Sequence, residues 1–174
     1  MEGIRVIMRN TFRIALVGAA LSAVSFASAA SAATSATANA SAEVLSTLTL
    51  TANSALNFGQ IAANTGGTVT VNADSTTASS GTLVSTGTRA PAGFTVTGTP
   101  NANVVLTLPA SATLTRSGGT ETMAIGGFNS NPAGAFQLGG TGSANFAVGG
   151  TLTVASGQVA GVYNGTFSVS VEYQ

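Results

Sequence analysis

The stretch of sequence that decides the fold is the last fourteen residues, GVYNGTFSVSVEYQ, residues 161–174. Aromatic and branched apolar side chains occupy five of its odd positions: Tyr163, Phe167, Val169, Val171 and Tyr173. The even positions from 164 to 172 are all polar, namely Asn, Thr, Ser, Ser and Glu. Because successive side chains of a β-strand point to opposite faces, this alternation predicts a final strand with one face in the core.

A second alternating segment lies near the start of the chain, over residues 34–52. Its even positions from Ala36 to Leu50 are mostly apolar, and its odd positions are mostly Ser, Thr, Asn or Glu. The pattern predicts an N-terminal alternating arm and first strand over residues 33–52. Leu45 and Ser46 break the alternation, which indicates a bulge or a bend. The alanines of the first half can fill only a shallow groove.

The region between these segments is built from short apolar runs separated by Gly, Asn and Pro. Strands are expected around residues 68–71, 83–85, 94–97, 104–108, 123–128, 136–138, 145–148 and 152–154. No segment after residue 32 keeps a helical apolar period for three turns. We therefore expect an all-β fold, an immunoglobulin-like or pilin-like β-sandwich over residues 53–174.

Two other all-β architectures agree less well with the sequence. A parallel β-helix suits the Gly and Asn turns, but the apolar runs show no fixed repeat. An outer-membrane barrel needs aromatic girdles, and aromatic residues make up only 6% of the chain.

The first 32 residues have the pattern of a signal peptide. Arg5, Arg9 and Arg13 precede an apolar run over residues 14–26, and Ala30-Ser31-Ala32 is a small-x-small cleavage site. An apolar run of about 13 residues is too short to span a bilayer, which takes ~20. We expect export to the periplasm, the cell surface or the medium, with no membrane span in the mature protein. Met1 and Met8 both remain open as start sites.

The composition argues against several classes of function. Charged residues make up 6% of the chain, and it contains no Lys, His, Cys or Trp. Most nucleophilic and acid–base catalysis uses His, Cys or Lys, and soft metals need such ligands, so we expect neither an enzyme nor a cofactor. After residue 32, two arginines stand against four carboxylates, a net charge of −2. We therefore expect no nucleic-acid partner.

The four mid-chain charges are isolated in sequence among polar residues. They are Asp74, Arg89, Arg116 and Glu121. Charged side chains are rarely buried, so we expect each of them to be a solvated loop residue.

The end of the chain resembles the C-terminal strand of chaperone–usher pilus subunits. The similar features are Gly161 fourteen residues from the end, the strict alternation after it, and a penultimate Tyr173. In that family the strand pairs with an assembly chaperone and lines a groove that a neighbour's N-terminal extension later fills. The chain departs from many pilus subunits in having no cysteine, so its cohesion cannot include a disulfide.

This resemblance implies an assembly surface and a set of partners. The residues that it implicates come from the arm and the last strand: Val44, Leu48, Leu50, Gly161, Tyr163, Phe167, Val169, Val171 and Tyr173. The implied partners are other copies of the chain or related subunits, a periplasmic chaperone and an outer-membrane usher.

The mature chain also resembles the bacterial family called domain of unknown function 4402. The similar elements are Leu48-Thr49-Leu50, Leu56-Asn57-Phe58-Gly59, Phe94-Thr95-Val96-Thr97-Gly98, Leu106-Thr107-Leu108-Pro109, Gly149-Gly150-Thr151-Leu152 and residues 161–167. This resemblance implies an exported β-domain but no mechanism.

Two functional hypotheses follow from the sequence. In the first, the protein is an exported fimbrial, pilin-like subunit that assembles by β-strand addition between copies. In the second, the arm pairs with its own domain, and the protein is a self-complete, monomeric periplasmic or cell-surface binding module of unknown ligand.

Signal-peptide cleavage is directly testable. We expect the mature protein to begin at Ala33, because the arginines, the apolar run and the cleavage site occur in the required order. Intact-mass spectrometry of the exported protein measures this. An exported protein that still begins at Met1 or Met8 would exclude the signal peptide.

Overall fold

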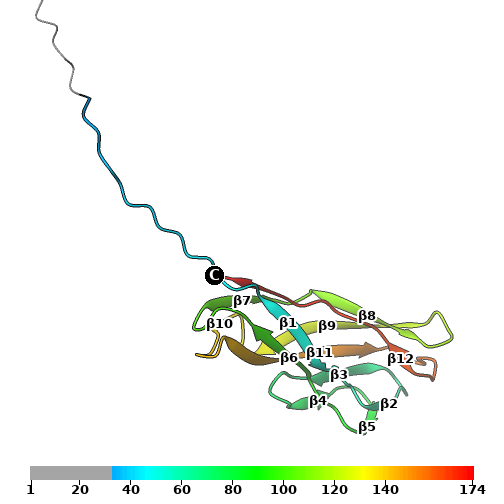
Figure 1. Ribbon diagram of the computed structural model, residues 1–174. Coiled ribbons are helices and arrows are strands. Elements are labelled where there is room, and N and C mark those ends of the chain that lie inside the picture. The colour runs from blue at the N-terminus through cyan, green and yellow to red at the C-terminus, as the bar shows by residue number, and fades with distance from the viewer. Residues whose placement is uncertain (1–32) are drawn as a thin grey trace, which may run out of the picture. The chain divides into compact units, whose positions relative to one another are not determined.

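The structure, a computed structural model, describes residues 33–174, so the expected signal peptide lies outside the described residues. The chain divides into two units, residues 1–41 and 42–174. In the first unit, residues 33–41 are exposed and have no regular secondary structure. The second unit holds the strands found in the described residues, which are labelled in Figure 1.

Residues 42–174 form strands and turns. The strands are β1 (Thr49–Ser54), β2 (Gln60–Ala62), β3 (Gly67–Val71), β4 (Thr77–Ser79), β5 (Val84–Thr86), β6 (Ala92–Thr97), β7 (Asn103–Thr107), β8 (Ser111–Arg116), β9 (Thr122–Asn131), β10 (Ala135–Gln137), β11 (Ser143–Val154), β12 (Tyr163–Asn164) and β13 (Ser170–Tyr173). The part of the chain that the structure describes contains no helix, which confirms the all-β expectation.

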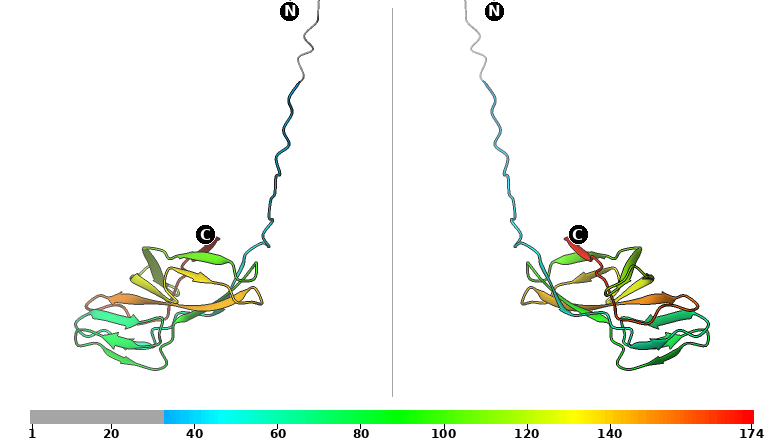
Figure 2. Two further views of the ribbon diagram at one scale, coloured as in Figure 1. Left: turned by 90° about the vertical axis from the view of Figure 1, so that its left-hand side faces the viewer. Right: turned by 90° about the vertical axis from the view of Figure 1, so that its right-hand side faces the viewer.

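The strands make three antiparallel sheets. The largest has the order β1-β6-β11-β9-β8-β12, with β3 paired to β11 and β4 to β3. A three-stranded sheet has the order β10-β7-β13, and β2 pairs with β5. Figure 2 shows the curled sheets from two sides. The long strand β11 pairs with β6 through residues 143–148 and with β3 through residues 150–154.

Two apolar clusters fill the core. The first contains Phe58, Val69, Val71, Leu83, Met123, Ile125, Leu152 and Val154. The second contains Ala92, Phe94, Val96, Val104, Leu106, Leu138, Phe146 and Val148, so it joins β6 and β11 of the large sheet to β7 of the three-stranded sheet. The rings of Phe94 and Phe146 stack with centroids 5.2 Å apart. Among the described residues no polar or charged residue is fully buried, so these clusters cohere by apolar packing.

The expected strands agree with the observed ones in the middle of the chain, with three differences. The runs at 145–148 and 152–154 belong to one strand, β11, because its Gly149-Gly150 interruption stays in the sheet. β2, β4 and β8 have weakly apolar sequences such as Ser-Ala-Thr-Leu-Thr-Arg and gave no clear signal. In the N-terminal segment a strand forms only from Thr49 onward, since the preceding alanine-rich residues 33–48 have no strand partner in the described chain.

The final strand has the expected phase but is divided into β12 and β13. Residues 163, 167, 169, 171 and 173 are half-buried, whereas residues 164, 166, 168, 170 and 172 are exposed. Phe167, Val169 and Val171 pack against the second core cluster. The alternation therefore assigned the faces correctly, although it did not indicate the interruption between the two strands.

The assignment of faces can be tested by substitution. Val169→Asp places a carboxylate against an apolar cluster and should reduce the free energy of unfolding by about 2 kcal/mol or more. Ser168→Asp places the same charge on an exposed position and should cost much less. Urea unfolding of the mature protein measures both changes. Equal losses of stability would show that both faces of this segment are covered.

Candidate functional site

A hollow with a mainly apolar lining lies between the end of β1 and the C-terminal segment. It encloses about 220 Å³. Its lining comes from both ends of the domain sequence and from the strands between: Ala52, Ser54, Ala55, Leu56, Phe58, Ala92, Phe94, Leu114, Ile125, Gly165, Thr166 and Phe167. We call this hollow the apolar pocket, because nearly all of its lining side chains are apolar.

One side of the apolar pocket is formed by a backbone segment without strand pairing. β12 pairs with β8 up to Asn164, and β13 pairs with β7 from Ser170 onward, but residues 165–169 belong to no strand. Extending the β13–β7 register back by two residues sets Ser168 opposite Pro109. Proline has no N–H to donate, so the antiparallel ladder cannot continue there.

Gly165 holds this segment close to β8. A Cβ at this position would collide with the backbone oxygen of Thr113, so only glycine allows the approach. Phe167 then turns its ring toward the second core cluster, where its centroid lies 6.2 Å from that of Phe94 and 5.1 Å from that of Phe128.

The outer edge of the C-terminal segment is unpaired in the described chain. β13 pairs with β7 on one side only, and β1 on the other side of the apolar pocket pairs only with β6. In an antiparallel ladder the N–H groups of alternate residues point to opposite sides. Gln174 N donates to Asn103 O, which places the β7-directed N–H groups on even positions. The N–H groups of Val169, Val171 and Tyr173 consequently point away from β7, and we call residues 165–173 the open edge.

A hydrogen-bonded cluster around Tyr173 fixes the start of β1 beside the open edge. The Tyr173 hydroxyl donates to the Ser46 carbonyl oxygen at 2.7 Å and accepts from the Thr99 N–H at 2.7 Å. Ser46 N in turn donates to Thr99 Oγ1 at 2.7 Å. Gly98 leaves room for this contact, because a Cβ there would collide with the phenol oxygen. We call this cluster the tyrosine latch.

The residues before the tyrosine latch make no such contacts. Residues 33–47 are all exposed, and the side chain of Val44 is 93% exposed. An exposed valine within an alternating segment has apolar surface available for another partner. We call residues 33–45 the free part of the arm.

The assembly residues expected from the sequence therefore fall into three groups. Leu48, Leu50, Phe167, Val169, Val171 and Tyr173 all pack on the second core cluster. Tyr163 packs on the first cluster, and Gly161 is exposed beside the Arg116 side chain. Val44 touches neither cluster. Sequence reasoning did not single out the pocket walls Leu56, Phe58 and Phe94 as site residues, although all three lie in elements shared with the resembling family.

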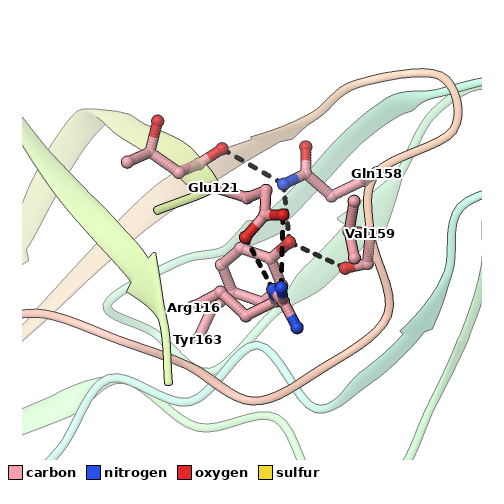
Figure 3. A network of polar contacts seen from close by, with 6 residues as sticks. Arg116, Glu121, Gln158, Val159 and Tyr163 are labelled. Carbon is pink, nitrogen blue, oxygen red and sulfur yellow. Dashed lines mark hydrogen bonds and ion pairs between the residues drawn. The ribbon is translucent and has the colours of Figure 1, made fainter. Parts of the chain in front are cut away.

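Arg116 and Glu121 are not separate solvated loop residues, because Arg116 ends β8 and pairs with Glu121, which corrects the expectation from the sequence. Arg116 Nε and Glu121 Oε2 form an ion pair at 2.7 Å with both side chains about one-third exposed (27% and 34%). The hydrogen bond from Arg116 lowers the pKa of Glu121 below its ordinary value. Nearby, Gln158 donates to the Tyr163 hydroxyl at 2.8 Å, and that hydroxyl donates to Val159 O at 2.7 Å (Figure 3). These contacts stabilise the pairing of β12 with the end of β8.

A second hollow, of about 410 Å³, is polar and lies over Asn72, Asp74 and Asn129. The Asp74 carboxylate accepts from the hydroxyl and the N–H of Thr76, and these bonds lower its pKa. Asn129 Oδ1 accepts from Ala73 N at 2.7 Å. The side chains of Asp74 and Asn129 are thus already hydrogen-bonded within the protein. Over residues 33–174 no group of three or more Asp, Glu, His or Cys side chains is arranged to hold a metal ion.

Within residues 33–174 no helix has the length and apolar character needed to cross a membrane. No curated protein and no solved structure matches the chain. The family model described as "Domain of unknown function (DUF4402)" matches residues 48–173, which include β1, the apolar pocket and the open edge. The chain therefore belongs to the DUF4402 family.

Proposed function

We propose that this protein is an exported structural subunit of a surface polymer, similar to a fimbrial pilin, which assembles by β-strand addition. The observation that carries the proposal is the open edge beside an apolar pocket, in a chain that also has an exposed, alternating N-terminal arm. An added strand would supply hydrogen-bond partners to the open edge and apolar side chains to the pocket.

The energetics favour an added strand at this place. Unpaired strand edges recruit further strands, and most proteins protect them with charges, prolines or covering loops. Between residues 165 and 173 the open edge has one charged residue, Glu172, and no proline. The apolar pocket beside it is lined in part by Leu56 and Phe167, which are only half-buried and would gain from further burial.

The proposal includes a fold and a route of assembly. We infer that the curled sheets form an immunoglobulin-like β-sandwich that an added strand completes, and that the signal peptide directs the chain to the periplasm. A periplasmic chaperone would cover the open edge before assembly, and an outer-membrane usher would deliver the subunit to the surface. The chemistry of the described site, which is apolar and backbone-based, favours a structural role over catalysis.

Removal of the free part of the arm tests the proposal. The mature protein should form filaments or large assemblies, and a variant lacking residues 33–45 should remain unassembled or aggregate irregularly, because no strand is left to add. The deletion retains Ser46, Leu48 and Leu50, so the tyrosine latch and the core remain. Electron microscopy and size-exclusion chromatography measure the outcome.

The control is an added peptide of residues 33–45, which should bind the truncated variant and keep it in solution. A full-length protein that stays monomeric at high concentration, with no filament on cells that express it, would contradict the proposal. That result would support the self-complete binding module instead.

A further inference from the structure

Two segments could fill the apolar pocket: the arm of the same chain or the arm of another copy. The largest apolar side chain on the alternating face of the free part of the arm is Val44, since the other even positions from 36 to 42 are alanines. The pocket has a volume of about 220 Å³, so a methyl group would leave most of it empty. Val44 is therefore the side chain whose burial there gains most.

Val44 cannot reach the apolar pocket of its own chain. The tyrosine latch fixes Ser46 three residues before β1, and the first lining residue, Ala52, lies six residues further along the chain. At about 3.3 Å per residue these two positions are roughly 20 Å apart. Val44 lies two residues from Ser46, a reach of at most ~7 Å. The distance excludes an intramolecular contact while the latch is closed.

We propose that Val44 of one copy occupies the apolar pocket of a second copy, and that its arm lies antiparallel to the open edge, with the alanines that precede Val44 extending from the pocket toward Tyr173. This inference rests on the proposed function and specifies the partner, the register and the direction of the added strand.

The direction follows from the short distance between Val44 and its own folded domain. Ser46, two residues after Val44, is already bound to the donor's own domain. The donor's domain must therefore lie next to the acceptor's apolar pocket and outside its open edge. The alanines at 36, 38, 40 and 42 then run along the open edge over Phe167, Val169 and Val171. Leu48 and Leu50 pack on the same core cluster as these three side chains, and the small alanines need little space beside them. The opposite direction would place a folded domain over the open edge itself.

This arrangement produces an open polymer. The donating end of the subunit is the tyrosine latch, and the receiving end is the apolar pocket, which lie at different ends of β1. A contact between two different surfaces of identical copies is head-to-tail and does not close on a pair. Each added subunit consequently presents another unfilled pocket.

Disulfide trapping tests the register, and the chain has no native cysteine to interfere. Val44→Cys and Ala55→Cys are made in separate full-length mature proteins, with Ala55 chosen because it is exposed and lies at the pocket rim. A disulfide requires Cα atoms within about 7 Å. Mixing the two variants under mild oxidation should give a heterodimeric disulfide at least tenfold more abundant than the pair of Val44→Cys with Val84→Cys. Val84 is 54% exposed and does not line the pocket.

A pair of single substitutions gives an independent measurement. Val44→Asp should raise the concentration needed for assembly at least tenfold, whereas Thr37→Asp, on the polar face of the same segment, should change it less than threefold. Both residues are exposed in the subunit, so neither change should prevent folding.

The outcomes separate this inference from the proposed function. Assemblies that form normally but give equal trapping at Ala55 and Val84, or equal effects of the two aspartates, would overturn the Val44 register and leave strand addition intact. A mature protein that never assembles would overturn both. A double variant carries both Val44→Cys and Ala55→Cys in one chain. An intramolecular disulfide in its monomer would show that the arm folds back on its own domain.

Discussion

The structure depends on the antiparallel pairing of the C-terminal strand with β7, which uses one edge of that strand and leaves the other unpaired. Backbone N–H and C=O groups are obligatory hydrogen-bonding groups, so an edge of this kind is either solvated or paired with another strand. Pro109 ends the ladder on the paired side, and Gly165 brings the segment back against β8. Between these two constraints the chain passes over the apolar pocket, so the interruption and the pocket are parts of one feature.

The tyrosine latch gives the arm a defined point of departure. One phenol hydroxyl joins Ser46, Thr99 and the last strand, which links residues 127 positions apart in sequence. A fixed start to the arm has a structural consequence, because Val44, two residues before Ser46, lies too far from the pocket of its own chain and stays available to another copy. The ion pair of Arg116 and Glu121 and the bonds around Tyr163 secure the other end of the same C-terminal segment.

Sequence reasoning predicted the faces of the last strand well and the state of the arm poorly, for physical reasons. Phe167, Val169 and Val171 carry enough apolar surface that their alternation shows directly which side is buried. The alternating alanines of the arm predict a strand, but a strand needs a partner, and alanine buries too little surface to secure one within the chain. The walls of the pocket, such as Phe58 and Phe94, come together only through sheet topology, which local periodicity does not contain. The family match supports the extent of the domain but assigns no role to these residues.

The most direct measurement is residue-specific amide hydrogen exchange over residues 169–172, at the start of β13. In the variant lacking residues 33–45, the N–H groups of Val169 and Val171, which face the open edge, should exchange rapidly, and those of Ser170 and Glu172, which face β7, should be protected. In the assembled full-length protein all four should be protected, because a neighbour's arm supplies the missing acceptors. Rapid exchange at Val169 and Val171 in the assembly, with Ser170 and Glu172 still protected, would show that nothing pairs with the open edge and would contradict the account.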